Sequence, residues 1–356
     1  RPYTMPVREK APWIPPRDWG RRYIWYPWIG GSSDLGVLFV LGWQSEGYGF
    51  RKDPYADKHS VRIGYATNAG GFGAEYRGEF LRENSRSWTG LHVRASGLDF
   101  LHFYGFGNDT EAPGDEDFYK VKQSLYRVEP SYTFPLAGKL MATLRANVTY
   151  AKTKLEANQY ITDVHPYGAD DFLQYGAGAG LSIDTRDSKV APMRGLEITA
   201  DGTVFPEAAD VVSAFGEVHG EIAYHQPLGR PTLSLRVAGK KVWRTYPYHE
   251  AAYIGGSRNV RGFPQQRFAG DASAFGNAEL RIPLTRVYIF VPGSLGVFAL
   301  ADVGRVFFEG ETSETWHSSA GGGVWCSFLN TANTASLAVA ASEEGTRIYL
   351  VAGLAF

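Results

Sequence analysis

The chain has 356 residues and a formal net charge of −1, with 36 Lys and Arg residues against 37 Asp and Glu residues. This balance, without a basic block at either end, argues against a nucleic-acid partner. No apolar run approaches the roughly 18 residues that a transmembrane helix needs, which excludes a helical membrane protein. Aromatic residues make up 14% of the chain, a supply that suits the interfacial girdles of a membrane β-barrel.

The first segment, residues 1–32, differs in composition from the rest of the chain. It holds six prolines and four tryptophans. Prolines at this density disfavour regular helix or sheet pairing and favour extended backbone. We therefore predict a Pro/Trp-rich periplasmic extension or linker over residues 1–32 and one barrel domain over residues 33–356.

From residue 35 onward, apolar and polar residues alternate over long segments. In residues 139–150 the even-numbered positions are apolar and most of the odd-numbered ones are polar, as in a strand with one apolar face. Soluble strands are usually about 5 to 6 residues long, so the length of these segments favours a membrane barrel. We predict an all-β, transmembrane antiparallel β-barrel of about sixteen strands. The first predicted strand is residues 35–44 and the last is residues 347–356. Residues 88–97 and 99–105 are predicted as two separate strands.

The predicted connections are of two kinds. Short turns such as 136–138 and 228–230 alternate with the long connections 106–117, 156–171 and 245–272. Short turns on one rim and long loops on the other are typical of outer-membrane barrels. With an even strand count, both termini are expected on the periplasmic side.

Two predicted strands carry glycines on the face assigned to the lumen. A barrel of about sixteen strands would leak unless something filled its lumen. Small residues on two walls make space for a loop folded into the lumen. These lumen glycines are Gly176, Gly178, Gly180, Gly321 and Gly323.

The segment GGSRNVRGF, residues 255–263, lies between the eleventh and twelfth predicted strands. Its arginine places a permanently charged fork at the tip of a Gly-rich turn. Upstream stands GLSIDTRDSKVAPMRG (180–195), downstream FALADVGRVF (298–307), and the chain ends in Phe356. In this order the motifs resemble the barrel of the superfamily that includes the outer-membrane protein insertases and the two-partner secretion transporters, also called the bacterial surface antigen family. The resemblance covers residues 33–356.

The resemblance implies that the tip of the long sixth surface loop lies in the lumen as a lock. A desolvated arginine needs a carboxylate partner, and bidentate pairing would pin the loop. The family places Asp302 opposite Arg261, and Glu279 on the neighbouring strand is a reserve partner. The loop-lock motif is Val260, Arg261, Gly262 and Phe263.

Closure of the barrel is expected to bring the first predicted strand, 35–44, against the last, 347–356. In the insertases this seam opens as a lateral gate and pairs with incoming strands. These two strands contain glycines. Such glycines would either weaken the seam or be ordinary barrel glycines at bends. Phe356 belongs to the kind of terminal strand that the barrel assembly machinery recognises. The seam residues are Gly36, Gly42, Gly353 and Phe356.

The family's insertases and transporters carry POTRA modules before the barrel, and residues 1–32 are too short to hold one. We therefore expect a POTRA-less barrel that inserts or translocates a protein or lipid substrate, with a periplasmic or outer-membrane protein partner. Two alternatives remain: a plugged structural anchor subunit of an envelope complex, and the membrane domain of a fused or processed enzyme.

The chain offers no strong catalytic constellation. Asp163, His165, Asp170 and Asp171 could approach a metal, but in a surface loop such a cluster is more often solvated. We predict no catalytic residue, metal or cofactor, and not an enzyme. The expected location is the bacterial outer membrane, in contact with outer-membrane lipid and lipopolysaccharide.

Overall fold

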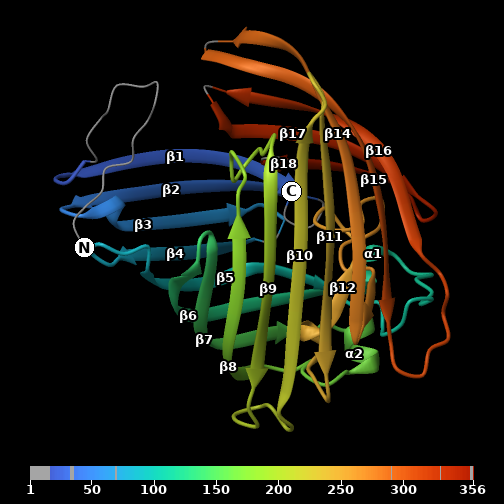
Figure 1. Cartoon of the computed structure of the whole chain (residues 1–356). Helices are drawn as coiled ribbons and strands as arrows, with labels where there is room; N and C mark the ends of the chain where they lie inside the picture. The colour runs from blue at the N-terminus through green and yellow to red at the C-terminus, as the bar shows by residue number, and fades with distance from the viewer. Residues whose placement is uncertain (1–16, 33–35, 69, 290, 329, 353–355) are drawn as a thin grey trace.

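The computed structural model describes residues 17–32, 36–68, 70–289, 291–328, 330–352 and 356. Sixteen antiparallel strands form one curved sheet that wraps into a barrel (Figure 1). A separate hairpin of β12 and β13 lies in the connection between β11 and β14. The elements are β1 (Arg21–Ser32), β2 (Gly36–Gly49), β3 (Lys52–Ala66), β4 (Gly71–Leu81), β5 (Trp88–His102), α1 (Glu116–Tyr119), β6 (Lys120–Ala137), β7 (Leu140–Lys154), α2 (Tyr160–Val164), β8 (Phe172–Asp184), β9 (Gly195–Phe205), β10 (Phe215–Pro227), β11 (Thr232–Trp243), η1 (Tyr248–Glu250), β12 (Ala252–Ile254), β13 (Phe268–Gly270), β14 (Ala272–Ile289), β15 (Val291–Phe307), β16 (His317–Phe328), β17 (Asn330–Ser342) and β18 (Gly345–Ala352).

The barrel has an apolar outside and a polar inside, which is the inverse of a soluble protein. On β7, Leu144 and Val148 are 52% and 42% exposed on the outer face. Arg145, between them in sequence, points inward and donates a hydrogen bond to Thr203. This alternation is what lipid outside and a polar lumen inside require. The predicted antiparallel barrel of sixteen strands is confirmed. Among the described residues, neither helix is long or apolar enough to cross a membrane.

The predicted boundary between a linker and the barrel is wrong for residues 21–32, which form β1. This strand pairs with β2 along its whole length, from Arg21 opposite Gly47 to Ser32 opposite Gly36. Pro27 does not prevent the pairing, because an edge strand tolerates a proline whose nitrogen faces away from the ladder. Residues 1–16, the rest of the predicted linker, lie outside the described residues.

The predicted separation of 88–97 from 99–105 is also wrong, because β5 runs continuously from Trp88 to His102. A register shift between Ser96 and Asp99 interrupts its ladder with β6. Such an irregularity breaks the alternation of side chains without ending the strand. One strand was therefore split and another missed, which is why the predicted count still equals the observed one.

The two edges of the sheet are β1 and β18, which approach each other where the barrel closes. Within the described residues no backbone ladder joins them. The strand predicted for the seam, 35–44, belongs to β2 and lies one strand away from the edge. Gly36 and Gly42 are therefore not on the seam strand, and a methyl group on Gly42 would collide with the Tyr26 ring of β1.

The two rims differ as predicted. One rim, the short-turn rim, joins strands by a few residues, as between β2 and β3 or between β10 and β11. The other, the long-loop rim, carries the connections 103–119, 155–171 and 244–271, which include α1, α2 and β12 (Figure 1). These long connections pack on one another in an apolar cluster that includes Phe103, Phe172, Phe215, Tyr246 and Tyr248.

Candidate functional site: an inward loop locked to the barrel wall

The connection between β11 and β14, residues 244–271, is called loop 6 here. Its β12–β13 hairpin presents a tip that is buried inside the barrel, with Val260, Arg261 and Phe263 each at most 3% exposed. The backbone of Phe106 pairs with Ala269, so a second long-loop connection covers the base of the hairpin. Loop 6 is therefore folded into the lumen, as predicted.

Arg261 binds two carboxylates at once. Its Nε and Nη2 donate to the two Asp302 oxygens, both at 2.7 Å, and its main-chain N–H donates to Asp302 at 3.0 Å. Its Nη1 donates to Glu279, which was predicted only as a reserve partner. Parallel bonds to a carboxylate are both strong and directional. The tip is thus pinned to β15 through Asp302 and to β14 through Glu279.

A second arginine balances the charge of this cluster. The Nε of Arg281 donates to Glu279 at 2.8 Å, and the amide of Asn277 donates to Asp302 at 2.7 Å. Arg261, Asp302, Glu279 and Arg281 form what we call the lock: two cations and two anions, each 3% exposed or less. Buried charges persist only with such complete pairing. Burial would lower the pKa of Arg261, but hydrogen bonds to Asp302 and attraction to Glu279 raise it, so the tip stays charged.

Two glycines make the close approach of the tip possible. A methyl group on Gly304 of β15 would lie 2.7 Å from Cγ2 of Val260. At the tip itself, Gly262 has a φ of +92°, which side chains disfavour, and an added methyl group would meet Ser319 and Ser342 at 3.1 Å. The strand β15 therefore supplies both the charge of Asp302, which binds Arg261, and the space at Gly304, which Val260 fills.

Loop 6 is also tied to the last hairpin, β17–β18. The main-chain N–H of Gly262 donates to the Tyr349 hydroxyl at 2.8 Å, and the Ser342 hydroxyl donates to the Gly262 carbonyl at 2.9 Å. Nearer β13, Arg267 donates to Glu344 in the β17–β18 turn at 2.7 Å. The tip therefore contacts the strand that forms one edge of the seam.

The bonds of the Tyr349 hydroxyl to the tip, from the Gly262 N–H and at 3.4 Å to the Phe263 carbonyl, can be tested by Tyr349→Phe, which removes the hydroxyl and keeps the ring. A net hydrogen bond contributes about 1 kcal/mol, so the Gly262 amide is expected to exchange its hydrogen with solvent roughly five-fold faster. Hydrogen–deuterium exchange of the tip measures this. Tyr224→Phe, which removes an outward-facing hydroxyl bonded to Gln226, should leave the tip unchanged. An unaltered exchange rate in Tyr349→Phe would show that this hydroxyl does not hold the tip.

Around the lumen glycines, the atoms nearest to an added methyl group belong to the barrel wall and not to the tip. An added methyl group on Gly176 would collide with the Asn147 side chain, and one on Gly178 with the Gly202 carbonyl. On β16, methyl groups on Gly321 and Gly323 would collide with carbonyl oxygens of β17. Gly180 faces Asp201 in the same way. These glycines allow neighbouring strands and lumen side chains to approach closely. Their role in making space for the loop stays a prediction.

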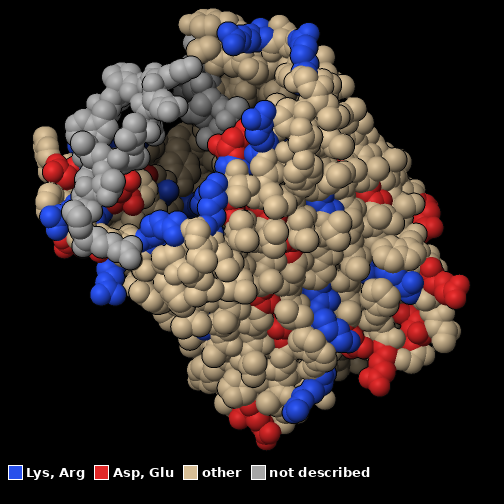
Figure 2. Space-filling model, viewed as in Figure 1, with Lys and Arg blue, Asp and Glu red and all other residues tan. Residues whose placement is uncertain are grey.

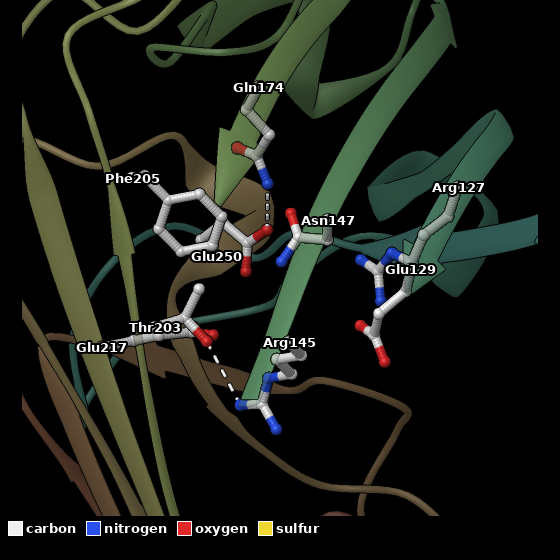
Figure 3. A pocket seen from close by; sticks show the side chains of 9 residues that line it. All are labelled: Arg127, Glu129, Arg145, Asn147, Gln174, Thr203, Phe205, Glu217 and Glu250. Carbon is white, nitrogen blue, oxygen red and sulfur yellow. Dashed lines mark hydrogen bonds between the residues drawn. The ribbon is translucent and has the colours of Figure 1, made fainter. Parts of the chain in front are cut away.

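Beside loop 6 the lumen holds a polar cavity of about 210 Å³. Figure 3 shows Gln174 of β8 reaching Glu250 of loop 6, and Arg145 of β7 reaching Thr203 of β9. Lys240 completes this wall, 2.7 Å from Glu217 and 3.7 Å from Glu250. Burial would raise the pKa of Glu250, but Lys240 lowers it, so Glu250 stays ionised. A charged residue of loop 6 is therefore held by the wall at a second place.

Phe356, expected at the end of the predicted terminal strand 347–356, does not share the outward face of that strand. Ile348 and Leu350 of β18 do face outward, at 71% and 58% exposed. The Phe356 ring instead lies near the guanidinium groups of Arg236 and Arg281, at 4.9 and 5.3 Å. The Nη2 of Arg281 also donates to the Phe356 main-chain oxygen at 2.7 Å. Gly353, the remaining predicted seam residue, lies outside the described residues.

The acidic surface cluster is spread along the 155–171 connection. His165 lies 3.4 Å from Asp170, and both side chains are exposed. Asp171 instead accepts a hydrogen bond from Tyr150 at 2.8 Å. In the part of the chain that the structure describes, no group of three or more His, Cys, Asp or Glu residues is arranged to hold a metal ion.

Comparisons with known proteins agree with this fold. Residues 53–332 match the Omp85 superfamily domain. The fold is similar to BamA from Haemophilus ducreyi lacking POTRA domains 1–3, with a TM-score of 0.65 and 12% identity over 91% of this chain and 69% of that one. It is also similar to CdiB from Acinetobacter baumannii, with a TM-score of 0.56 and 10% identity over 93% of this chain and 59% of that one. No curated protein matches the chain significantly.

Proposed function

The chain belongs to the Omp85 superfamily, and from this premise we propose that it inserts or translocates a protein or lipid substrate at the bacterial outer membrane, together with a partner. Loop 6 and its lock keep the lumen closed between events. The proposal places the short-turn rim and both termini in the periplasm.

The observation that carries this proposal is the contact between loop 6, which plugs the lumen, and the edge strand at the seam. Loop 6 is held by charges on β14 and β15, and its tip also bonds to Tyr349 on the edge strand β18. An edge strand presents unpaired N–H and C=O groups that can pair with an incoming strand. A substrate that pairs with β18 would therefore act on the strand that touches the plug.

The completeness of the lock favours a second candidate function, a plugged structural anchor subunit of an envelope complex. Four buried charges are fully paired, and the long connections pack over the loop 6 hairpin. A barrel that never opens would need only this arrangement. The two functions differ in whether a substrate reaches β18.

Site-specific photo-crosslinking distinguishes them. A benzophenone amino acid replaces Ile348, an outward-facing residue of β18, or Ile222, an outward-facing residue of β10 on a wall away from the seam. An insertase or transporter is expected to capture a nascent outer-membrane protein at position 348 and not at 222. Equal capture at both positions, or a single stoichiometric partner at 348 throughout growth, would favour the anchor.

A further inference from the structure

The short-turn rim repeats one chemical pattern around the barrel. Four of its turns, and β14 where it passes this rim, pair a large exposed apolar side chain with an exposed cation close by in sequence. The apolar side chains are 41% to 65% exposed. The pairs are Phe50 with Arg51, Leu136 with Lys139, Val190 with Lys189, Leu228 with Arg230, and Leu284 with Arg286.

Contacts show one of these pairs packed together and place neighbouring turns side by side on one rim. The Arg51 guanidinium lies 4.9 Å from the centre of the Phe50 ring. Arg230 of the β10–β11 turn donates to the Leu284 carbonyl at 3.1 Å, which places the end of β14 beside that turn. Arg86 of the β4–β5 turn likewise donates to the Gly138 carbonyl at 2.7 Å. Neighbouring turns of this basic band are therefore joined at two places.

The charge of this band contrasts with that of the opposite rim. In the turns 50–51, 82–87, 136–139, 185–194, 228–231 and at 284–286, eight exposed Lys and Arg residues face two exposed acids, Glu83 and Asp187. On the long-loop rim, the connections 103–119, 155–171, 206–214 and 308–316 together hold fourteen Asp and Glu residues and no Lys or Arg. Figure 2 shows acidic side chains gathered toward that end of the molecule.

We propose that the short-turn rim binds the anionic phospholipid headgroups of the membrane leaflet that borders it. At a membrane interface, an apolar side chain can enter the acyl region while a neighbouring cation stays at the level of the headgroups. Lysine and arginine favour this arrangement. Each cation near an anionic membrane surface strengthens association roughly five-fold, an effect that fades within a Debye length.

The distribution of the pairs favours a lipid over an acidic protein. A protein partner covers one contiguous face, whereas these pairs follow the circumference from the β2–β3 turn to the end of β14. Their apolar members also need a hydrocarbon environment, because side chains such as Phe50, Leu136 and Leu228 are more than half exposed. This inference depends only on the barrel being embedded in a membrane and not on what the barrel inserts or translocates.

The test measures which lipid surrounds the full chain. The protein is reconstituted in phosphatidylcholine vesicles that contain brominated phosphatidylglycerol or brominated phosphatidylcholine, and quenching of its tryptophans gives the selectivity between the two headgroups. Lys139→Gln, Lys189→Gln and Arg286→Gln are combined. Arg86 and Arg230 are kept because they hold neighbouring turns together. The matched control combines Lys152→Gln, Lys154→Gln and Arg244→Gln, exposed cations near the long-loop rim.

The wild type and the control triple are expected to select phosphatidylglycerol several-fold at about 0.01 M salt and to lose this selectivity at about 1 M, where the Debye length falls from about 30 Å to about 3 Å. The short-turn triple should lose roughly five-fold or more in selectivity already at low salt. Equal selectivity in all three proteins, or none in the wild type, would overturn the proposal. A loss of selectivity in the control triple alone would do so as well. Heat-modifiable migration in gels confirms that each barrel is folded.

Discussion

Arg261→Ala is expected to open the lumen and to raise the single-channel conductance well above that of the wild type. The substitution removes one cation from the lock. Glu279 then keeps Arg281 as its partner, and Asp302 loses its ion pair. Breaking a buried ion pair in this way costs about 3 to 5 kcal/mol. This cost destabilises the closed state. The open state avoids it, because water reaches both carboxylates once the tip leaves the barrel wall. Recordings in planar bilayers measure the change.

Arg258→Ala is the matched control, because Arg258 is an exposed arginine of the same loop. It should conduct like the wild type. Arg261→Lys should lie between them, since one ammonium cannot reproduce the bidentate pairing with Asp302. The exchange Arg261→Asp with Asp302→Arg should not restore closure, because the new carboxylate at 261 would face Glu279. If Arg261→Ala and Arg258→Ala gave the same small conductance, the lock would not be what closes the pore.

Gly304→Ala is expected to expel the tip without altering any charge of the lock. The added methyl group would lie 2.7 Å from Val260 Cγ2 and 2.9 Å from Phe275 Cβ, closer than side chains can pack. Forcing extra volume into a packed core costs about 1 to 3 kcal/mol. The conductance should therefore rise, though less than in Arg261→Ala, and tryptic cleavage within loop 6 should become faster.

Gly276→Ala on the neighbouring strand is the control for this change. Its methyl group would meet only the Arg236 carbonyl at 3.6 Å and Val303 at 3.9 Å, which are ordinary contacts. It should behave like the wild type in both assays. A closed, protease-resistant Gly304→Ala protein would mean that Val260 can repack, and that space at Gly304 does not govern the plug.

The parts of the site that the sequence predicts are those that lie in short, chemically distinctive segments. Arg261 and Asp302 each stand in a recognisable motif, and a buried arginine requires a carboxylate. Arg281 stands in no recognisable motif. It lies two residues from Glu279 on the same face of a strand, and this spacing was the one indication that the two side chains could pair. Ser342 and Tyr349 were missed because their contacts with Gly262 join residues 80 and 87 positions apart. Such contacts depend on the curvature and closure of the sheet, which alternation alone does not determine.

The fold was predicted where alternation is regular and missed where a local feature hides it. The irregularity near Ser96 divided β5, and the prolines and tryptophans of residues 21–32 concealed β1. Alternation along the predicted terminal strand would place Phe356 on the same face as Ile348 and Leu350. Its ring instead lies beside two buried arginines, whose attraction for an aromatic face outweighs the pattern.

Pro27 has a consequence for the free edge of the barrel. Because proline has no N–H, a strand added to that edge gains no donor at this position, and β1 offers two shorter stretches, 21–26 and 28–32, in place of one long template. Short or proline-interrupted edges are how proteins avoid uncontrolled edge-to-edge aggregation. Pro27, which made this strand hard to recognise, therefore also allows the barrel to keep an unpaired edge without promoting its own aggregation.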